Sequence, residues 1–120
     1  MSWTNEQIKE YQRRPEVKLR RRYNDLLKYY NLTPEKHAEI LQRQNYKCAF
    51  PHCDIVVDIL SPIDHDHNCC PYVAPRSTSC GKCIRGILCA KHNVGLGYFD
   101  SNPECLFDAY AYLRGMYVKA

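Results

Sequence analysis

The sequence lacks a long apolar run, and it has a single tryptophan. No stretch of its 120 residues is apolar enough to cross a bilayer, and the opening Met1-Ser2-Trp3-Thr4-Asn5-Glu6 lacks the apolar core of a signal peptide. No Gly/Ser-rich segment marks a boundary between two compact units. These absences argue against a membrane or exported protein. We expect a cytoplasmic chain without a membrane partner, with one modest core and a helical N-terminal extension.

Cysteine, in contrast, is abundant, with eight residues. A reducing compartment removes disulfides and leaves thiolates free to bind zinc. In a chain without an export signal, this number of cysteines favours metal sites over disulfides.

Basic residues are concentrated near the N-terminus. The formal net charge is +4, and residues 9–28 alone contain eight basic and three acidic side chains. A charged helix face is usually only solvated, but three consecutive arginines favour contact with an anionic polymer such as DNA. The candidates for this contact are Lys18, Arg20, Arg21, Arg22 and Lys28.

Helical spacing of apolar residues, together with Pro and Thr at cap positions, predicts helices on both sides of a central strand region. His37 is expected on a helix surface. The predicted helices cover residues 5–30 (one helix, or two divided at Pro15), 34–44 with Thr33 as N-cap, Cys89 or Ala90 to about Gly97, and 103–113, and the predicted strands cover 55–60 and 84–88. This order of elements predicts a small α+β fold.

Two pairs of zinc-type residues bracket the predicted strands. Cys48 and Cys53 precede the strands. Cys89 and His92 follow them, so that the two pairs can meet in one tetrahedral site. His52 competes with Cys53 as the second ligand, and Cys53 is preferred because a thiolate binds zinc more strongly. We expect a structural zinc that stabilises a small core, with buried free thiols as the alternative.

The most informative run is Asp64-His65-Asp66-His67, followed by Ile84-Arg85-Gly86-Ile87-Leu88-Cys89 and then by His92-Asn93. Hydrolysis of a phosphodiester needs a hard cation on oxygen ligands, a neutral imidazole to deprotonate water, and a rigid support for both. These motifs resemble the recombination endonuclease VII branch of the HNH (His-Me finger) nucleases, phage-type, over roughly residues 32–113. The alternatives are a polar strand end without catalysis and a His pair that only binds zinc.

The resemblance implies a zinc-stabilised ββα-metal (HNH) motif with N-terminal helices and a C-terminal helix. The domain would span residues 32–120, after a basic helical extension of residues 1–31. In the family, two residues rather than four usually separate the first ligand pair, and the fourth ligand is usually Cys where this chain has His92. Zinc sites accept both changes, so the expected fold is the same.

The resemblance also assigns roles to individual residues. Asp64 and Asn93 would bind Mg²⁺ or Mn²⁺, and His65 would be the general base. His67 would hydrogen-bond the phosphate or support the site. Arg85 could reach a backbone phosphate, or be an ordinary solvated strand residue.

An insertion from Asn68 to Lys82 departs further from the family pattern. Cys80-Gly81-Lys82-Cys83 resembles a zinc knuckle, and Cys70 with either Cys69 or His67 could complete a second zinc site. Adjacent cysteines rarely ligate one metal comfortably, so a disulfide or free thiols are the alternatives.

The predicted function is metal-dependent hydrolysis of DNA, mainly duplex, by nicking or double-strand cleavage that leaves a 5′-phosphate. The alternatives are a noncatalytic zinc-dependent nucleic-acid-binding module and a resolvase of branched DNA junctions. A binding module has no need for the set Asp64, His65 and Asn93. Junction-cutting members of the family carry a long C-terminal region where this chain has one short helix. We expect a monomer or homodimer, with phage packaging proteins as candidate partners.

Overall fold

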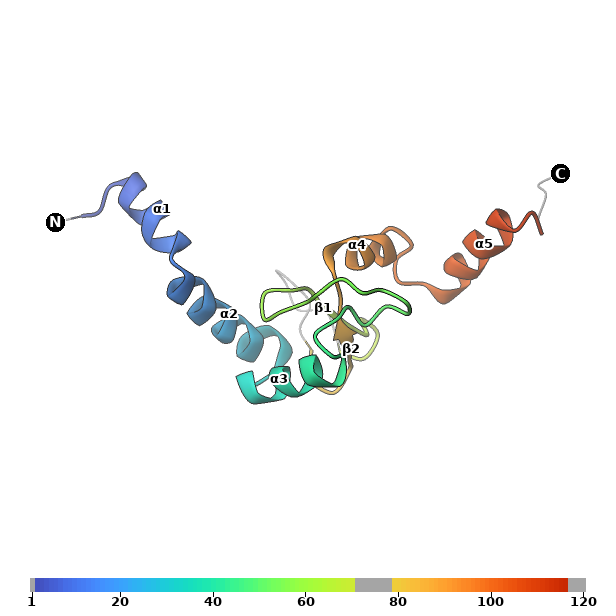
Figure 1. Cartoon of the computed structure of the whole chain (residues 1–120), viewed down its shortest axis with the longest axis horizontal. Helices are drawn as coiled ribbons and strands as arrows, with labels where there is room; N and C mark the ends of the chain where they lie inside the picture. The colour runs from blue at the N-terminus through green and yellow to red at the C-terminus, as the bar shows by residue number, and fades with distance from the viewer. Residues whose placement is uncertain (1, 71–78, 117–120) are drawn as a thin grey trace. The chain divides into compact units, whose positions relative to one another are not determined.

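The structure, a computed structural model, describes residues 2–70 and 79–116. The described elements are α1 (Asn5–Arg13), α2 (Pro15–Tyr30), α3 (Pro34–Arg43), β1 (Ile63–His65), β2 (Ile84–Ile87), α4 (Ala90–Tyr98) and α5 (Pro103–Leu113), in the order that Figure 1 shows. This is a small α+β fold, as predicted. The chain divides into two compact units, residues 1–89 and 90–120. In the described ranges no helix has the length and apolar character needed to cross a membrane.

The N-terminal helices begin and end where their sequence places caps. Thr4 caps α1 by accepting a hydrogen bond from the Gln7 amide, and the Gln7 side chain accepts one from Thr4 in return. Pro15 occupies the first position of α2, so of the two alternatives, one long helix or two divided at Pro15, the structure has the second. Thr33 caps α3 by accepting from the Lys36 amide, as its position before Pro34 predicted.

The predicted strand over residues 55–60 is wrong. The structure gives this segment only an isolated bridge between Lys47 and Val56. Val56 is 74% exposed, and only Val57 of the segment is buried. An apolar run forms a central strand only when neighbours cover both of its faces, and here one side chain supplies the burial. The first strand is instead β1, which contains Asp64 and His65, the first two residues of the predicted catalytic run Asp64–His67.

The strands β1 and β2 pair antiparallel with one irregularity. Ile63 pairs with Ile87 and Asp64 with Gly86, but His65 pairs with Ile84, so Arg85 is an extra residue in β2. Such a bulge changes the direction of the side chain that it carries. The sheet therefore presents Arg85 at the middle of the predicted catalytic run.

A glutamine and a glycine fix the outer edge of β2. The Gln44 side chain accepts from the Ile87 amide and donates to the Ile87 carbonyl, both at 2.9 Å. The Ala49 amide also donates to that carbonyl, at 3.0 Å. Gly86 leaves room for this approach, because a Cβ there would lie 2.7 Å from the Ala49 Cβ.

The described core lies in the first unit and is small. Its buried apolar residues are Val17, Leu26, Leu32, Leu41, Cys48, Val57, Ile63, Ile87, Leu88 and Cys89. Two of the ten are cysteines of the predicted zinc site, so metal binding and core packing occupy the same place.

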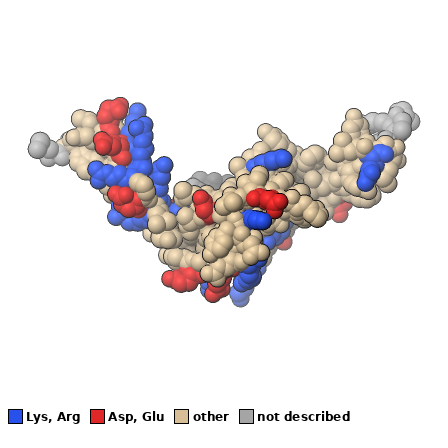
Figure 2. Space-filling view, viewed as in Figure 1, with Lys and Arg blue, Asp and Glu red and all other residues tan. Residues whose placement is uncertain are grey.

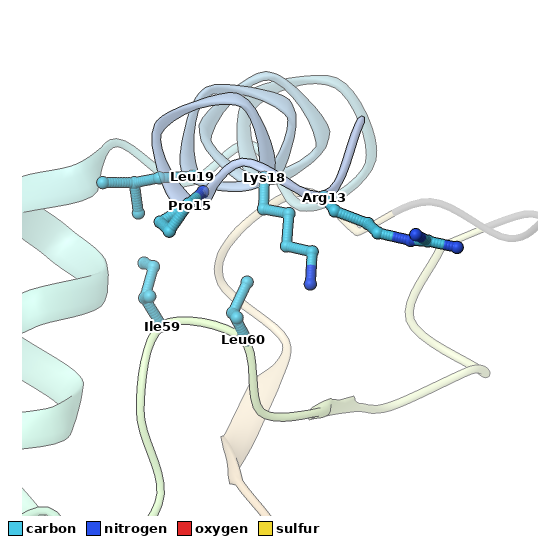
Figure 3. Close-up of a pocket in the computed structure, with 6 residues that line it drawn as sticks. All are labelled: Arg13, Pro15, Lys18, Leu19, Ile59 and Leu60. Atoms are coloured by element: carbon cyan, nitrogen blue, oxygen red, sulfur yellow. The ribbon is translucent and has the colours of Figure 1, made fainter. Parts of the chain in front are cut away.

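The helix α2 is fastened to the loop that precedes β1. The Arg22 guanidinium donates to the carbonyls of Ile59 and Ser61, each at 2.8 Å. A groove of about 400 Å³ lies beside this contact, where Leu19 faces Ile59 and Lys18 extends toward the loop (Figure 3). The basic helix α2 is thus held against the segment that leads into β1.

The second unit contains the two helices predicted at the C-terminal end of the chain. Pro103 is at the first position of α5, and the Asn102 side chain accepts from the amides of Glu104 and Cys105. No residue described in this unit is buried.

Candidate active site and metal centres

The carboxylate of Asp64 is held by an arginine. Arg85 donates from Nε to one carboxylate oxygen at 2.7 Å and from Nη2 to the other at 2.9 Å. The Asp64 side chain is 13% exposed and that of Arg85 is 45% exposed. The carboxylate is therefore largely covered, and both of its oxygens are held by the more exposed guanidinium. The sequence did not reveal this pair, because the bulge that brings the two side chains together has no signature of its own.

The imidazole of His65 is buried beside aromatic rings. Its ring packs edge-on against that of Tyr30, with centroids 5.8 Å apart, and lies 4.4 Å from that of His67. Its Nδ1 has no hydrogen-bond partner among the described residues. Burial and the nearby His67 lower the pKa of His65, and Asp64 opposes them. At neutral pH the ring is thus a neutral base that can take a proton.

The first group of zinc-type ligands comes together as predicted. One ligand atom from each of Cys48, Cys53, Cys89 and His92 lies within 4.8 Å of the others. Two of these residues, Cys48 and Cys89, are buried, and the Cys89 amide donates to the Cys48 sulfur at 3.2 Å. Three thiols and an imidazole form a ligand set typical of structural zinc. His52 is outside the group.

The second group also comes together, with four cysteines and without His67. The sulfur atoms of Cys69, Cys70, Cys80 and Cys83 lie within 4.8 Å of one another, and all eight cysteines of the chain are described as free thiols. The Lys82 amide donates to the Cys80 sulfur, and this hydrogen bond is the main cause that lowers the pKa of Cys80 to about 7. Hydrogen bonds among the four thiols raise the pKa of Cys69 to about 12, so the group shares its protons when no metal is bound. The insertion's residues 71–78 lie outside the described residues.

Residues 79–83, which include two of these cysteines, form hydrogen bonds with the end of α2 on one side and with the residue that follows β1 on the other. The Ser79 amide donates to the Tyr29 carbonyl at 2.7 Å, and the Asn31 side chain donates to the Cys80 carbonyl at 3.0 Å. On the other side, the Asp66 amide donates to the Cys83 carbonyl at 2.9 Å. The segment that carries Cys80 and Cys83 therefore joins the end of α2 to the residue that follows β1.

The residues predicted to contact DNA differ in their exposure to solvent. Lys18, Arg20, Arg21 and Lys28 are exposed, and Arg22 is half-buried. Figure 2 shows blue side chains gathered over the N-terminal helices, with acidic side chains beside them. The Arg22 guanidinium donates hydrogen bonds to two loop carbonyls, so this residue has a structural role. Its position in a run of arginines did not indicate that role.

Two further residues behave differently from what the sequence suggested. His37 is fully buried rather than on the helix surface, and neither of its ring nitrogens has a partner among the described residues. Asn93 lies in α4, next to His92. Its role as a cation ligand stays a prediction, as do the roles assigned to Asp64, His65 and His67. The domain boundary at residue 31 also stays a prediction.

The arrangement so far is a two-stranded sheet with an acid and an imidazole of lowered pKa in β1. In sequence, the first cysteine group brackets the two strands and the second lies between them. The family model described as recombination endonuclease VII matches residues 23–115. No curated protein and no solved structure matches the chain. The match covers most of the chain, including both strands and both cysteine groups. The chain belongs to the recombination endonuclease VII family, a family of DNA endonucleases.

Proposed function

We propose that the protein is an HNH endonuclease that uses a divalent cation to hydrolyse DNA phosphodiesters and leaves a 5′-phosphate. The observation that supports this most strongly is the neutral, buried imidazole of His65 directly after the carboxylate of Asp64. A noncatalytic module would gain nothing from a buried base at a strand end.

His65 takes the proton of the attacking water, and its lowered pKa keeps it unprotonated at neutral pH. Asp64 and Asn93 would hold Mg²⁺ or Mn²⁺. When bound, the cation stabilises the negative charge that develops on the phosphate and the departing 3′ oxygen. In the described part of the chain, Asp64 belongs to no group of three His, Cys, Asp or Glu ligands. One carboxylate nevertheless fits Mg²⁺, which keeps several waters and takes phosphate oxygens as further ligands.

The two cysteine groups each hold a structural Zn²⁺ in this proposal. The zinc ion of the first group would stabilise the core. The zinc ion of the second group would hold residues 79–83 between the end of α2 and the end of β1. The exposed basic residues of α2 contact the backbone of duplex DNA. A monomer would nick one strand, whereas a homodimer could cut both.

Plasmid nicking by the full chain tests the proposal. Protein purified with zinc is freed of other divalent ions by dialysis, without a chelator, because EDTA would also remove structural zinc. We expect nicking on addition of Mg²⁺ or Mn²⁺ and its loss in His65→Ala. His52→Asn is the matched control, because His52 is exposed and asparagine tolerates its positive φ of 63°.

The pH dependence of the nicking rate is a second test of His65 as the base. Because the pKa of His65 is lowered, the rate should stay high as the pH falls and decline only below about 6.5. Full activity in His65→Ala would reject His65 as the base. Binding without cleavage on plasmid, single-stranded DNA and a four-way junction would favour the noncatalytic module, and cleavage of the junction alone would favour a resolvase.

A further inference from the structure

The pair of Asp64 and Arg85 occupies the place where the proposed function needs a cation. Both carboxylate oxygens of Asp64 accept hydrogen bonds from one guanidinium. A divalent cation on either oxygen would lie within a few ångströms of that guanidinium, where two positive charges repel strongly. The cation and Arg85 therefore compete for one carboxylate.

Arg85 is placed so that it can leave. Its side chain is half-exposed, whereas that of Asp64 is largely covered. Its Nη2 contacts the His65 carbonyl only weakly, at 3.4 Å. When the guanidinium leaves Asp64, its donors stay beside the catalytic run because the bulge fixes the backbone of Arg85 there. The parallel N–H donors of a guanidinium, which fit the two oxygens of a carboxylate, also fit two oxygens of a phosphate.

We propose that Arg85 is an exchangeable counter-ion, which neutralises Asp64 before the cation binds and then moves to a phosphate of the DNA. This inference rests on the proposed function, since it assumes a cation on Asp64. It predicts that the cation and DNA each strengthen the binding of the other through Arg85, because the cation frees the guanidinium that the phosphate uses.

Binding of Mn²⁺ to the zinc-loaded full chain, without DNA, tests the first half. We expect Arg85→Gln to tighten Mn²⁺ binding roughly fivefold, the effect that a partly exposed ion pair typically has. Arg85→Lys, which keeps the charge but loses the parallel donors, should lie between Arg85→Gln and the unchanged protein. Arg43→Gln, which removes an exposed positive charge on α3, is the matched control and should change little.

The outcomes separate this inference from the proposed function. If Arg85→Gln binds Mn²⁺ no more tightly than the unchanged protein, the competition does not exist and the inference is overturned. If Asp64→Asn binds Mn²⁺ as well as the unchanged protein does, Asp64 is not a ligand, and the proposed function fails with it.

DNA affinity tests the second half. A labelled duplex is titrated with the His65→Ala protein, with and without Mn²⁺, followed by fluorescence anisotropy. Mn²⁺ should strengthen DNA binding, and this enhancement should fall severalfold in His65→Ala/Arg85→Gln but persist in His65→Ala/Arg43→Gln. An enhancement that is unchanged by Arg85→Gln would overturn the movement to phosphate.

Discussion

The contact between Gly86 and Ala49 offers a sharp test of the packing around β2. A Cβ at position 86 would lie 2.7 Å from the Ala49 Cβ and 3.3 Å from the Gln44 Oε1. Two Cβ atoms cannot rotate away from each other, so the backbone must shift where Gln44 and Ala49 both bond to Ile87. Overpacking of this kind costs about 1–3 kcal/mol, and we expect Gly86→Ala to lower the free energy of unfolding by that amount.

A double-mutant cycle isolates the clash. Ala49→Gly alone should cost about 0.4–1 kcal/mol through the added freedom of the unfolded chain. In Gly86→Ala/Ala49→Gly the offending pair of Cβ atoms is gone, so the double variant should be more stable than the sum of the two losses by about 1 kcal/mol or more.

Urea unfolding followed by circular dichroism, at a fixed excess of Zn²⁺, measures each variant. Gly95→Ala is the control, because a Cβ at Gly95 meets nothing within 4 Å and alanine favours the helix. The predicted clash would be refuted if the stability loss of the double variant equals the sum of the two single losses within about 0.5 kcal/mol. It would also be refuted if the Gly86→Ala protein is as stable as the unchanged one.

Three further predictions concern other parts of the structure. Burial lowers the pKa of His37, so the unfolded chain takes up more protons than the folded one and stability should fall as the pH drops below about 6.5; His37→Phe should flatten this dependence in urea unfolding at several pH values. Arg22→Met should cost about 1.5–3 kcal/mol by removing charged donors from two loop carbonyls, whereas Arg21→Met should cost little in the same assay. Cys83→Ser should lower zinc from two ions per chain to one by elemental analysis, and a content that stays unchanged would exclude the second site.

The helices were largely predictable because their ends carry local signals. Pro15, Pro34 and Pro103 each occupy the first position of a helix, where the missing amide hydrogen costs nothing. The strand predicted at residues 55–60 was wrong because β-branched composition does not reveal whether neighbours will cover both faces. β1 is only three residues long and has too little pattern to predict a strand by itself.

In the candidate site, the cysteine groups were more predictable than the charged residues. Paired spacing of zinc-type ligands is a local signal, and both groups assemble in the structure. The partner of an arginine, in contrast, depends on contacts across the fold. Neither the ion pair of Arg85 with Asp64 nor the hold of Arg22 on two carbonyls could be derived from sequence spacing.

The extra residue in β2 decides whether the guanidinium of Arg85 lies against Asp64 or His65. A regular ladder continuing from the pair of Asp64 and Gly86 would place Arg85 opposite His65, on the same face as the imidazole. Arg85 already lowers the pKa of His65 from its place beside Asp64, and a guanidinium opposite the ring would lower this pKa further. The bulge instead directs the charge to the carboxylate. A one-residue change of strand length at this point would therefore alter the charge beside Asp64 and His65 without replacing either residue.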